Sequence, residues 1–175
     1  GVYEAANYFA NGRRPEKLGQ AHRGSSPYQV FQTSDGWLTI GGAQQNFFRR
    51  LCELIGQPEL ADDPRFKANA DRVRNNDLIV ELLQAEVRKR STADWMAVLE
   101  AEGIPAGPVL HHDEVFTDPQ ILARGMVAEV DHAKAGRQKT LGVPLKLSAT
   151  PGSVRRAAPT LGQHDGEIRG RKRKN

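Results

Sequence analysis

The alternation of hydrophobic and polar positions predicts a β-hairpin in residues 26–40. This segment contains two runs of aromatic and β-branched residues, with the pair Asp35-Gly36 between them. Asp-Gly pairs are favoured in two-residue hairpin turns because both positions tolerate the positive φ that such turns require. We therefore expect two antiparallel strands that are joined at Asp35-Gly36.

Apolar residues at three- and four-residue spacing predict four helices around this hairpin. One covers residues 1–12, which begin without an initiator Met or a capping residue, as expected for the middle of a longer protein. The apolar faces of the other three contain Phe47, Phe48, Leu51, Cys52 and Ile55; Leu78, Ile79, Leu82, Leu83 and Val87; and Trp95, Val98 and Leu99. Gly56 and Gly103 are typical helix-ending residues, and Ser91 begins a capping-box pattern.

The remainder of the chain is predicted to be extended or irregular. Residues 104–110 contain two prolines, which favour a rigid extended connection. Asp118 and Pro119 suit the start of a short helix. Residues 126–130 and 140–147 are predicted strands, the second with Pro144 at an edge or bulge, and irregular chain is expected from Ser148 onward. The predicted fold class is α+β, with a small antiparallel sheet and three to four helices.

The positive charge of the chain belongs to its end. Of the 25 Lys and Arg residues, five lie in the last seven positions, which leaves 20 basic against 21 acidic residues elsewhere. A short basic run can bind an anionic surface, but a solvated, disordered tail is the more common arrangement and is expected here for residues 169–174. The body has no basic stripe with interleaved aromatics, so we do not expect nucleic acid as a partner.

Two further features restrict the class of protein. No apolar run approaches the roughly 18 residues that a membrane span needs, so no membrane association is expected. Cys52 is the single cysteine, which excludes an internal disulfide and a zinc site built from cysteines. A reducing compartment, the cytoplasm, is the expected location.

A series of short motifs, in a fixed order, resembles the second half of the class III CoA-transferases, the family that includes formyl-CoA and carnitine CoA-transferases and α-methylacyl-CoA racemase. The resemblance runs from about Asn11 to His164. It rests on Gly19-Gln20-Ala21-His22-Arg23-Gly24-Ser25, Pro27-Tyr28, Thr33-Ser34-Asp35-Gly36, Leu51-Cys52-Glu53-Leu54-Ile55-Gly56, Asp63-Pro64-Arg65-Phe66 with Arg72, Trp95, Gly103-Ile104-Pro105-Ala106-Gly107-Pro108-Val109, Asp118-Pro119-Gln120, Arg124-Gly125, Gly142-Val143-Pro144, Thr150-Pro151 and Pro159-Thr160-Leu161-Gly162-Gln163-His164. Each motif is weak alone, whereas the ordered series is specific.

This resemblance implies three segments. Residues 1–25 correspond to a linker helix and an active-site loop, residues 26–147 to the small α+β domain and a return strand, and residues 148–175 to an irregular C-terminal segment with the basic tail. Family members resembling this chain also have a large Rossmann-like domain and form interlocked homodimers. The expected partners are therefore the missing N-terminal half or a second subunit, together with acyl-CoA and carboxylate substrates.

The resemblance also implies a reaction. In the family an aspartate of the large domain attacks an acyl-CoA thioester and later carries CoA as an aspartyl thioester. That aspartate lies in the half absent from this sequence, so no catalytic residue is expected in this chain, which alone should be inactive. Coenzyme A is expected as a substrate, in thioester form, and no permanently bound cofactor is expected.

The predicted substrate-binding residues are Gly24, Ser25, Ser26 and Tyr28. In formyl-CoA transferase the matching loop is glycine-rich and closes over the intermediate; here only Gly24 persists, between polar neighbours. Glycine lets backbone N–H groups approach a reacting carbonyl and lets a lid move. The alternative is an ordinary loop that leads into the hairpin.

Other chemical groups favour structural interpretations. Gly41 and Gly42 lack the spacing of a phosphate-binding motif and suit a strand-to-helix turn that needs small residues. His111, His112, Asp113 and Glu114 contain metal-capable side chains, but adjacent residues do not converge on one ion, and no metal is expected. Cys52 lies on the apolar face of a predicted helix, where a buried, inert thiol is expected.

Three functions remain open from the sequence. The first is transfer of CoA between carboxylic acids. The second is epimerisation of a 2-methylacyl-CoA, because racemases of this family share the same half. The third is a truncated, non-catalytic domain for assembly or binding. A Rossmann-like half with an aspartate nucleophile, encoded upstream of Gly1, would favour an enzyme.

Overall fold

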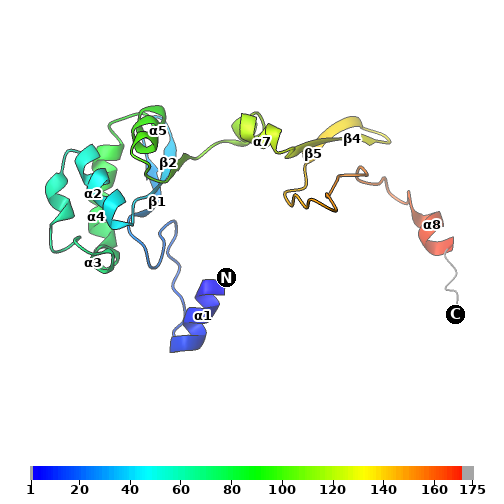
Figure 1. Ribbon diagram of the computed structural model, residues 1–175. Coiled ribbons are helices and arrows are strands. Elements are labelled where there is room, and N and C mark those ends of the chain that lie inside the picture. Colours follow the sequence, from blue (N-terminus) through cyan, green and yellow to red (C-terminus); the bar gives the residue numbers. More distant parts are fainter. Residues whose placement is uncertain (1, 171–175) are drawn as a thin grey trace. The chain divides into compact units, whose positions relative to one another are not determined.

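The computed structural model describes residues 2–170 and divides the chain into two compact units (Figure 1). The N-terminal unit comprises Gly1–Val109 and the C-terminal unit comprises Leu110–Asn175. The division between them falls inside the predicted segment 26–147. The fold class is α+β, as predicted.

A three-stranded antiparallel sheet forms one side of the core of the N-terminal unit. Strands β1 (Tyr28–Gln32) and β2 (Trp37–Gly41) make the predicted hairpin, and β3 (Ala106–Pro108) pairs with β2. In β2, Leu38 and Ile40 point into the core and alternate with exposed residues. The predicted extended connection is thus the third strand of the sheet.

The turn of the hairpin differs from the prediction. The Thr33 amide donates to the Gly36 carbonyl over 2.9 Å, so Ser34 and Asp35 are the central residues, and neither Asp35 nor Gly36 has a positive φ. The positive-φ turn expected at Asp35-Gly36 is therefore wrong. Side-chain contacts account for this conformation, because the Thr33 hydroxyl and the Asp35 carboxylate both contact Thr92 at the start of a distant helix.

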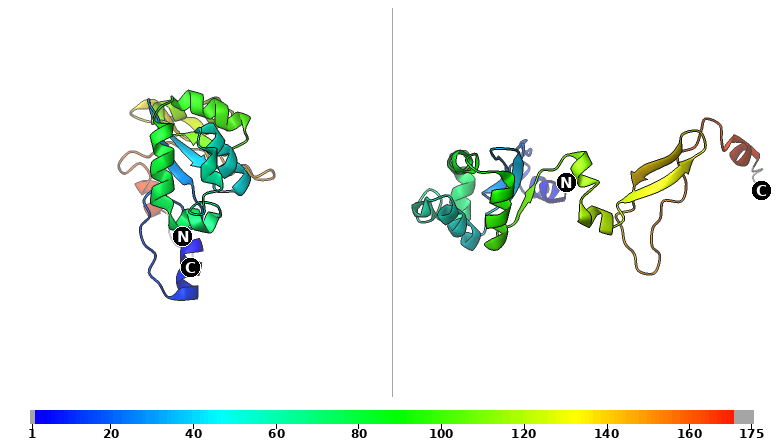
Figure 2. Two further views of the ribbon diagram at one scale, coloured as in Figure 1. Left: turned by 90° about the vertical axis from the view of Figure 1, so that its left-hand side faces the viewer. Right: turned by 90° about the horizontal axis from the view of Figure 1, so that it is seen from above.

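The helices of this unit pack their apolar faces against the sheet. The three helices predicted after the hairpin are α2 (Gln45–Leu54), α4 (Asn76–Val87) and α5 (Thr92–Ala101), which Figure 2 shows close to the strands. Gly56 and Gly103 follow α2 and α5 with φ of 74° and 64°, the left-handed conformation of helix ends. A 3₁₀ helix, Pro58–Ala61, and a short helix, α3 (Asn69–Arg74), were not predicted. The core contains Phe31, Leu38, Ile40, Phe48, Leu51, Cys52, Ile55, Leu60, Ala61, Phe66, Ile79, Leu83, Val87, Trp95, Leu99 and Ile104.

The first helix, α1 (Val2–Asn11), has no buried residue. Its apolar side chains Val2, Tyr3 and Phe9 are each more than four-fifths exposed. The Glu4 carboxylate accepts a hydrogen bond of 2.9 Å from Arg23 Nε, which links the helix to the loop that precedes the hairpin. The helix is present as predicted, but the core of this unit does not include it.

The C-terminal unit contains no buried residue between positions 110 and 170. Its elements are α6 (His112–Val115), α7 (Pro119–Ala123), the antiparallel strands β4 (Val127–His132) and β5 (Gly136–Leu141), and α8 (Asp165–Gly170). Asp118 caps α7 as predicted by accepting from the Gln120 and Ile121 amides.

Two expectations for the C-terminal unit need correction. The second strand lies at Gly136–Leu141 rather than 140–147, because Gly136, at φ 70°, closes a tight turn directly after β4. Pro144 has no N–H to donate, in keeping with the end of pairing before it. The segment from Ser148 is not wholly irregular, since α8 begins at Asp165. Of the basic tail, Arg169 lies in α8, and the four cations from Arg171 to Lys174 lie outside the described residues.

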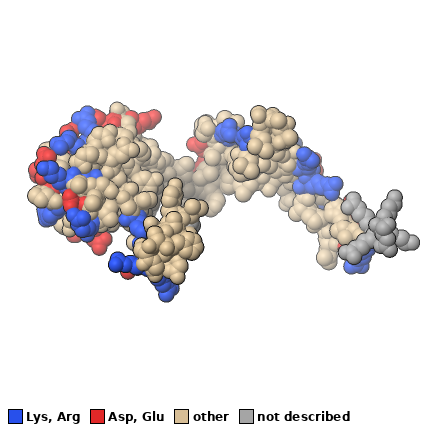
Figure 3. Space-filling view, turned by 60° about the horizontal axis from the view of Figure 1, so that its bottom comes forward, with Lys and Arg blue, Asp and Glu red and all other residues tan. Residues whose placement is uncertain are grey.

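Acidic and basic side chains are interspersed on the face of the N-terminal unit that Figure 3 shows. Ion pairs of this unit include Arg49 with Asp62, Arg50 with Glu102, and Lys89 with Glu86. Among residues 2–170, no helix combines the length and the apolar composition that crossing a bilayer requires.

Candidate functional site

The loop that precedes β1 is attached to the fold on one side. Ser26, 1% exposed, donates from its amide to Asn69 Oδ1 over 3.1 Å and from its hydroxyl to Asn76 Oδ1 over 2.8 Å. Asn69 Nδ2 donates to the Gly24 carbonyl over 2.9 Å. The loop 24–26 is therefore bound by side chains from α3 and from the start of α4.

A buried arginine completes this attachment. Arg72 Nε donates to the Ser26 carbonyl over 2.7 Å, and the same guanidinium donates to the carbonyls of Phe66 and Ala43. The guanidinium also lies over the Phe48 ring, 4.2 Å from its centroid. Burial lowers the pKa of Arg72, yet an arginine keeps its charge, and backbone carbonyls with the aromatic face here solvate it.

The opposite side of the loop is open. Gly24 is exposed, and a Cβ placed on it would meet no atom within 4 Å. The Gly24 amide donates to His22 Nδ1 over 3.1 Å, whereas the Ser25 amide has no hydrogen-bond partner among the described residues. A backbone N–H that is free in this way can donate to a carbonyl oxygen of a bound molecule.

Tyr28 lies beside the loop at the first position of β1. Its side chain is 53% exposed, and its ring meets the His22 ring edge-on with 5.4 Å between centroids. The His22 amide donates to the Tyr28 carbonyl over 3.2 Å. The structure thus brings all four predicted residues into one region, with Gly24, Ser25 and Tyr28 accessible and the Ser26 side chain turned inward. Their role in binding substrate stays a prediction.

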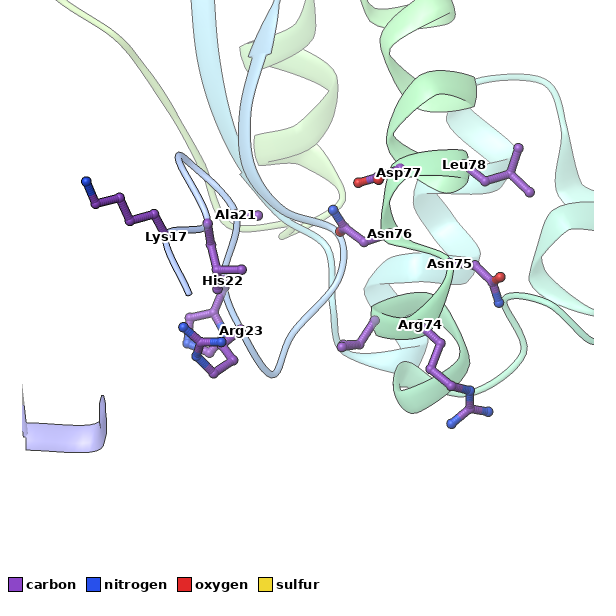
Figure 4. A pocket seen from close by; sticks show the side chains of 11 residues that line it. Lys17, Ala21, His22, Arg23, Arg74, Asn75, Asn76, Asp77 and Leu78 are labelled. Atoms are coloured by element: carbon purple, nitrogen blue, oxygen red, sulfur yellow. The ribbon is translucent and has the colours of Figure 1, made fainter. Parts of the chain in front are cut away.

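A cavity of about 660 Å³ adjoins this region (Figure 4). One wall comes from the loop before the hairpin, with Lys17, His22 and Arg23, and the other from the α3–α4 junction, with Arg74 and Asp77. Arg23 pairs with Glu4 and Arg74 with Asp71, so two of the three cations are already partly neutralised. A second cavity of about 610 Å³ includes Gly24 in its lining. The second cavity is also lined by Glu4 and Glu16, so the first, with Lys17 in its lining, is the more favourable of the two for an anionic molecule.

The other chemical candidates have structural roles. Burial raises the pKa of Cys52 to about 12, so this thiol is protonated at neutral pH and is a poor nucleophile. Glu114 accepts from the His111 amide over 2.7 Å and so caps α6. Within residues 2–170, no three His, Cys, Asp or Glu side chains are grouped closely enough to hold a metal ion. Gly42 is buried, and a Cβ there would lie 3.1 Å from Leu51 and 3.3 Å from Pro27, which confirms the need for small residues after β2.

Sequence reasoning missed the residues that hold the loop. Asn69 and Asn76 are 43 and 50 positions from Ser26, and each lies near the start of a helix, where Asn is common for local reasons. Arg72 belongs to one of the motifs in the sequence, but no local sequence pattern indicated that it is buried or which groups it binds. Only the packing of α3 against the loop reveals their shared contact.

Comparison with known proteins assigns the chain to a family. The family model described as CoA-transferase family III matches residues 2–165. The mouse succinyl-CoA:glutarate CoA-transferase is 35% identical over 164 residues, which are 94% of this chain and 38% of that protein. The succinate–glutarate CoA-transferase of Agrobacterium fabrum is 34% identical, over 93% of this chain and 40% of its own length.

A bacterial formyl-CoA:oxalate CoA-transferase, from Bradyrhizobium diazoefficiens, is 32% identical over 87% of this chain and 37% of its own. Among solved structures, a CAIB/BAIF family protein from Brucella suis superimposes with a TM-score of 0.76 at 34% identity. That match covers 97% of this chain and 43% of the other. The chain thus spans about two-fifths of the length of these relatives.

Proposed function

Because the chain belongs to CoA-transferase family III, we propose that it supplies the C-terminal part of an enzyme that moves CoA between carboxylic acids. The observation that carries the proposal is the family match over residues 2–165. It is supported by the loop 24–26, which is held by side chains on one side and is open on the other. The relatives described above are named as transferases, which favours transfer of CoA over racemisation.

The chemistry requires a nucleophile that this chain does not supply. A carboxylate outside the chain attacks the thioester carbonyl of the acyl-CoA, which breaks the C–S bond and forms a mixed anhydride with release of the CoA thiolate. The thiolate then attacks the enzyme's own carbonyl, which frees the original acid and leaves an enzyme-bound CoA thioester. The acceptor acid repeats these two steps in reverse, so that no oxidant or reductant is needed.

The loop is suited to assist where negative charge develops on a carbonyl oxygen. The Ser25 amide is available as a donor, and Gly24 beside it presents no side chain to an approaching thioester. The neighbouring cavity has Lys17, Arg23 and Arg74 in its lining, which suits the carboxylate of an acid or a phosphate of CoA. These features support a role for the loop as a cover over the reacting carbonyl.

Exposed apolar residues of the C-terminal unit support the proposal that another part of the enzyme packs against this unit. The C-terminal unit has no buried residue up to Gly170, where the described part ends, and Leu122, Leu141, Leu145 and Leu147 are each at least half exposed. The relatives are more than twice as long as this chain. We infer that the remaining part of such a longer enzyme covers these residues, either in the same subunit or in the second subunit of a homodimer.

The test is an assay of this chain alone, of a candidate N-terminal part alone, and of the two mixed. The donors are succinyl-CoA and formyl-CoA, with glutarate and oxalate as acceptors, since these compounds appear in the names of the relatives. We expect turnover only in the mixture. A 2-methylacyl-CoA of defined configuration is included to detect epimerisation.

Each result has a distinct meaning. Turnover by this chain alone contradicts the assignment of the nucleophile to another segment. Epimerisation without transfer replaces the transferase by a racemase. A stable complex of the two parts that is inactive with every donor and acceptor favours the non-catalytic domain and overturns the enzyme proposal.

A further inference from the structure

Three side chains far from the loop in sequence bind it at consecutive points: Asn69 and Arg72 bind its backbone, and Asn76 binds the Ser26 hydroxyl. Asn69 contacts both the Gly24 carbonyl and the Ser26 amide, and thereby clamps residues on either side of Ser25. Arg72 Nε donates to the Ser26 carbonyl, and Asn76 accepts from the Ser26 hydroxyl. Every polar group of Ser26 therefore has a partner on α3 or α4.

The free amide of Ser25 lies between these attachment points. The Ser25 N–H lies in the same peptide plane as the Gly24 carbonyl, which Asn69 binds, so fixing that carbonyl fixes the direction of the donor. Asn69 also holds the next peptide through the Ser26 amide. A hydrogen-bond donor assists a reaction only when it is held within a fraction of an ångström of the place where charge develops. Fixing residues 24 and 26 is thus a direct means of orienting residue 25.

We propose that Asn69 is a positioning residue for the reaction, which aims the Ser25 amide by clamping the loop backbone. Arg72 fixes the following peptide, and Asn76 fixes the Ser26 side chain. The inference rests on the proposed function for the role in turnover, but the clamp itself does not. Both hydrogen bonds of the Asn69 side chain go to the loop backbone. Arg72, in contrast, also binds the Phe66 and Ala43 carbonyls, so its removal would disturb the core and could not isolate an effect on the loop.

The chain offers a matched control for Asn69. Gln84 also clamps a backbone with its amide: its Oε1 accepts from the Gln32 amide over 2.9 Å, and its Nε2 donates to the Gln32 carbonyl over 2.7 Å. Gln84→Ala therefore loses the same two kinds of hydrogen bond at a different place. Asn69→Ala and Gln84→Ala should lower the thermal midpoint by similar amounts.

The first measurement is amide hydrogen exchange, followed by NMR, in the unmodified chain and in its variants. Asn69→Ala should speed exchange of the Ser26 amide about tenfold or more, because Asn69 Oδ1 is the sole acceptor for that N–H in the part of the chain that the structure describes. Gln84→Ala should leave Ser26 unchanged and speed exchange at Gln32. Asn69→Asp keeps the acceptor and loses only the donor to Gly24, so it should restore protection of Ser26. Unchanged exchange of Ser26 in Asn69→Ala would overturn the clamp.

The second measurement is steady-state turnover by the assembled enzyme. Asn69→Ala should lower kcat about tenfold or more with little change in KM for the acyl-CoA. The reason is that a misdirected donor reduces stabilisation of the transition state more than it reduces binding of the substrate. Gln84→Ala should stay within about twofold of the unmodified enzyme if the loss is specific to the loop. Faster Ser26 exchange in Asn69→Ala with unchanged kcat would overturn the positioning role. An inactive unmodified assembly would instead refute the proposed function, and with it the role in turnover, while exchange still decides the clamp.

Discussion

At the scale of single residues, two glycines, one before β1 and one after β2, have opposite surroundings. Gly42 is buried, and any side chain there would press on Leu51 and Pro27. Gly24 has a φ that other residues adopt and open space where a Cβ would project. The fold thus requires the glycine at position 42 but not the glycine at position 24. A requirement for Gly24 would have to come from a bound molecule.

Gly24→Val should consequently leave the thermal midpoint almost unchanged, while it abolishes CoA transfer in the assembled enzyme. Gly42→Val is the control, and it should destabilise the chain because the new methyl groups overlap Leu51. Calorimetry and the turnover assay provide the two measurements. Full turnover by Gly24→Val would show that no substrate or partner approaches the loop closely at this position.

At the scale of elements, one aromatic residue of α5 packs in the core beside the buried Leu99 of the same helix. Trp95 is 1% exposed, its Nε1 donates to the Val87 carbonyl at the end of α4 over 2.8 Å, and Arg90 lies over its ring. Burial of Trp95 confirms the sequence prediction. One side chain thereby joins α5 to the end of α4 and to the core beneath the sheet.

Trp95→Ala should reduce the free energy of unfolding by about 3–5 kcal/mol, the usual loss when a buried aromatic is removed. Trp37→Ala is the control, since Trp37 is 44% exposed on β2, and its loss should be about 1 kcal/mol or less. Urea titrations followed by circular dichroism give both values. Equal losses for the two variants would contradict the assignment of Trp95 to the core.

The hairpin turn and α5 are joined by a carboxylate. Asp35 Oδ1 accepts from the Thr92 amide over 2.8 Å and from the Thr92 hydroxyl over 3.0 Å. These bonds favour the ionised form and lower the pKa of Asp35 below its ordinary value of 3.8. The stability from this contact is therefore fully present above the pKa of the unfolded chain and is lost as pH falls through the lower pKa of the folded chain.

Asp35→Asn should make the chain less stable than the unmodified protein at pH 7, and the difference should shrink as pH falls below the ordinary Asp value of 3.8. Thermal midpoints at a series of pH values measure this. Glu100→Gln, at an exposed position of α5, is the control for removing a carboxylate that does not bind Thr92. A constant difference between Asp35→Asn and the unmodified chain at all pH values would show that the charge does not contribute.

At the scale of the whole molecule, burial among residues 2–170 is confined to the N-terminal unit. All core residues lie between Phe31 and Ile104, whereas residues 110–170 are exposed or half-exposed throughout. Local opening is easiest where few apolar contacts must be broken. The two units should therefore respond very differently to a protease.

Limited trypsin digestion of the isolated chain should cut first at Arg124, Lys134, Arg137, Lys139 and Lys146, and should leave a resistant fragment that contains residues 26–109. Mass spectrometry identifies the products. Addition of the complementary part of the enzyme should slow these cuts if it covers the C-terminal unit. Survival of residues 110–147 for as long as the N-terminal core would contradict the expected difference.

Much of the N-terminal unit was predictable because its signals are local. The spacing of Phe48, Leu51 and Cys52 determined one face of α2, and alternation in β2 determined that Leu38 and Ile40 point inward. Helix stops at Gly56 and Gly103 follow from the conformational freedom of glycine. The ordered motifs also sufficed to indicate the family, which the match over residues 2–165 confirms.

By itself, then, the sequence determined the hairpin, the three core helices, the burial of Trp95 and the family, since each depends on neighbours in the chain or on order along it. Only the tertiary structure decided the form of the turn at Asp35 and the attachment of the loop to Asn69, Arg72 and Asn76. Those contacts join residues more than 40 positions apart, so they leave no periodic or local pattern and arise only when distant elements pack together.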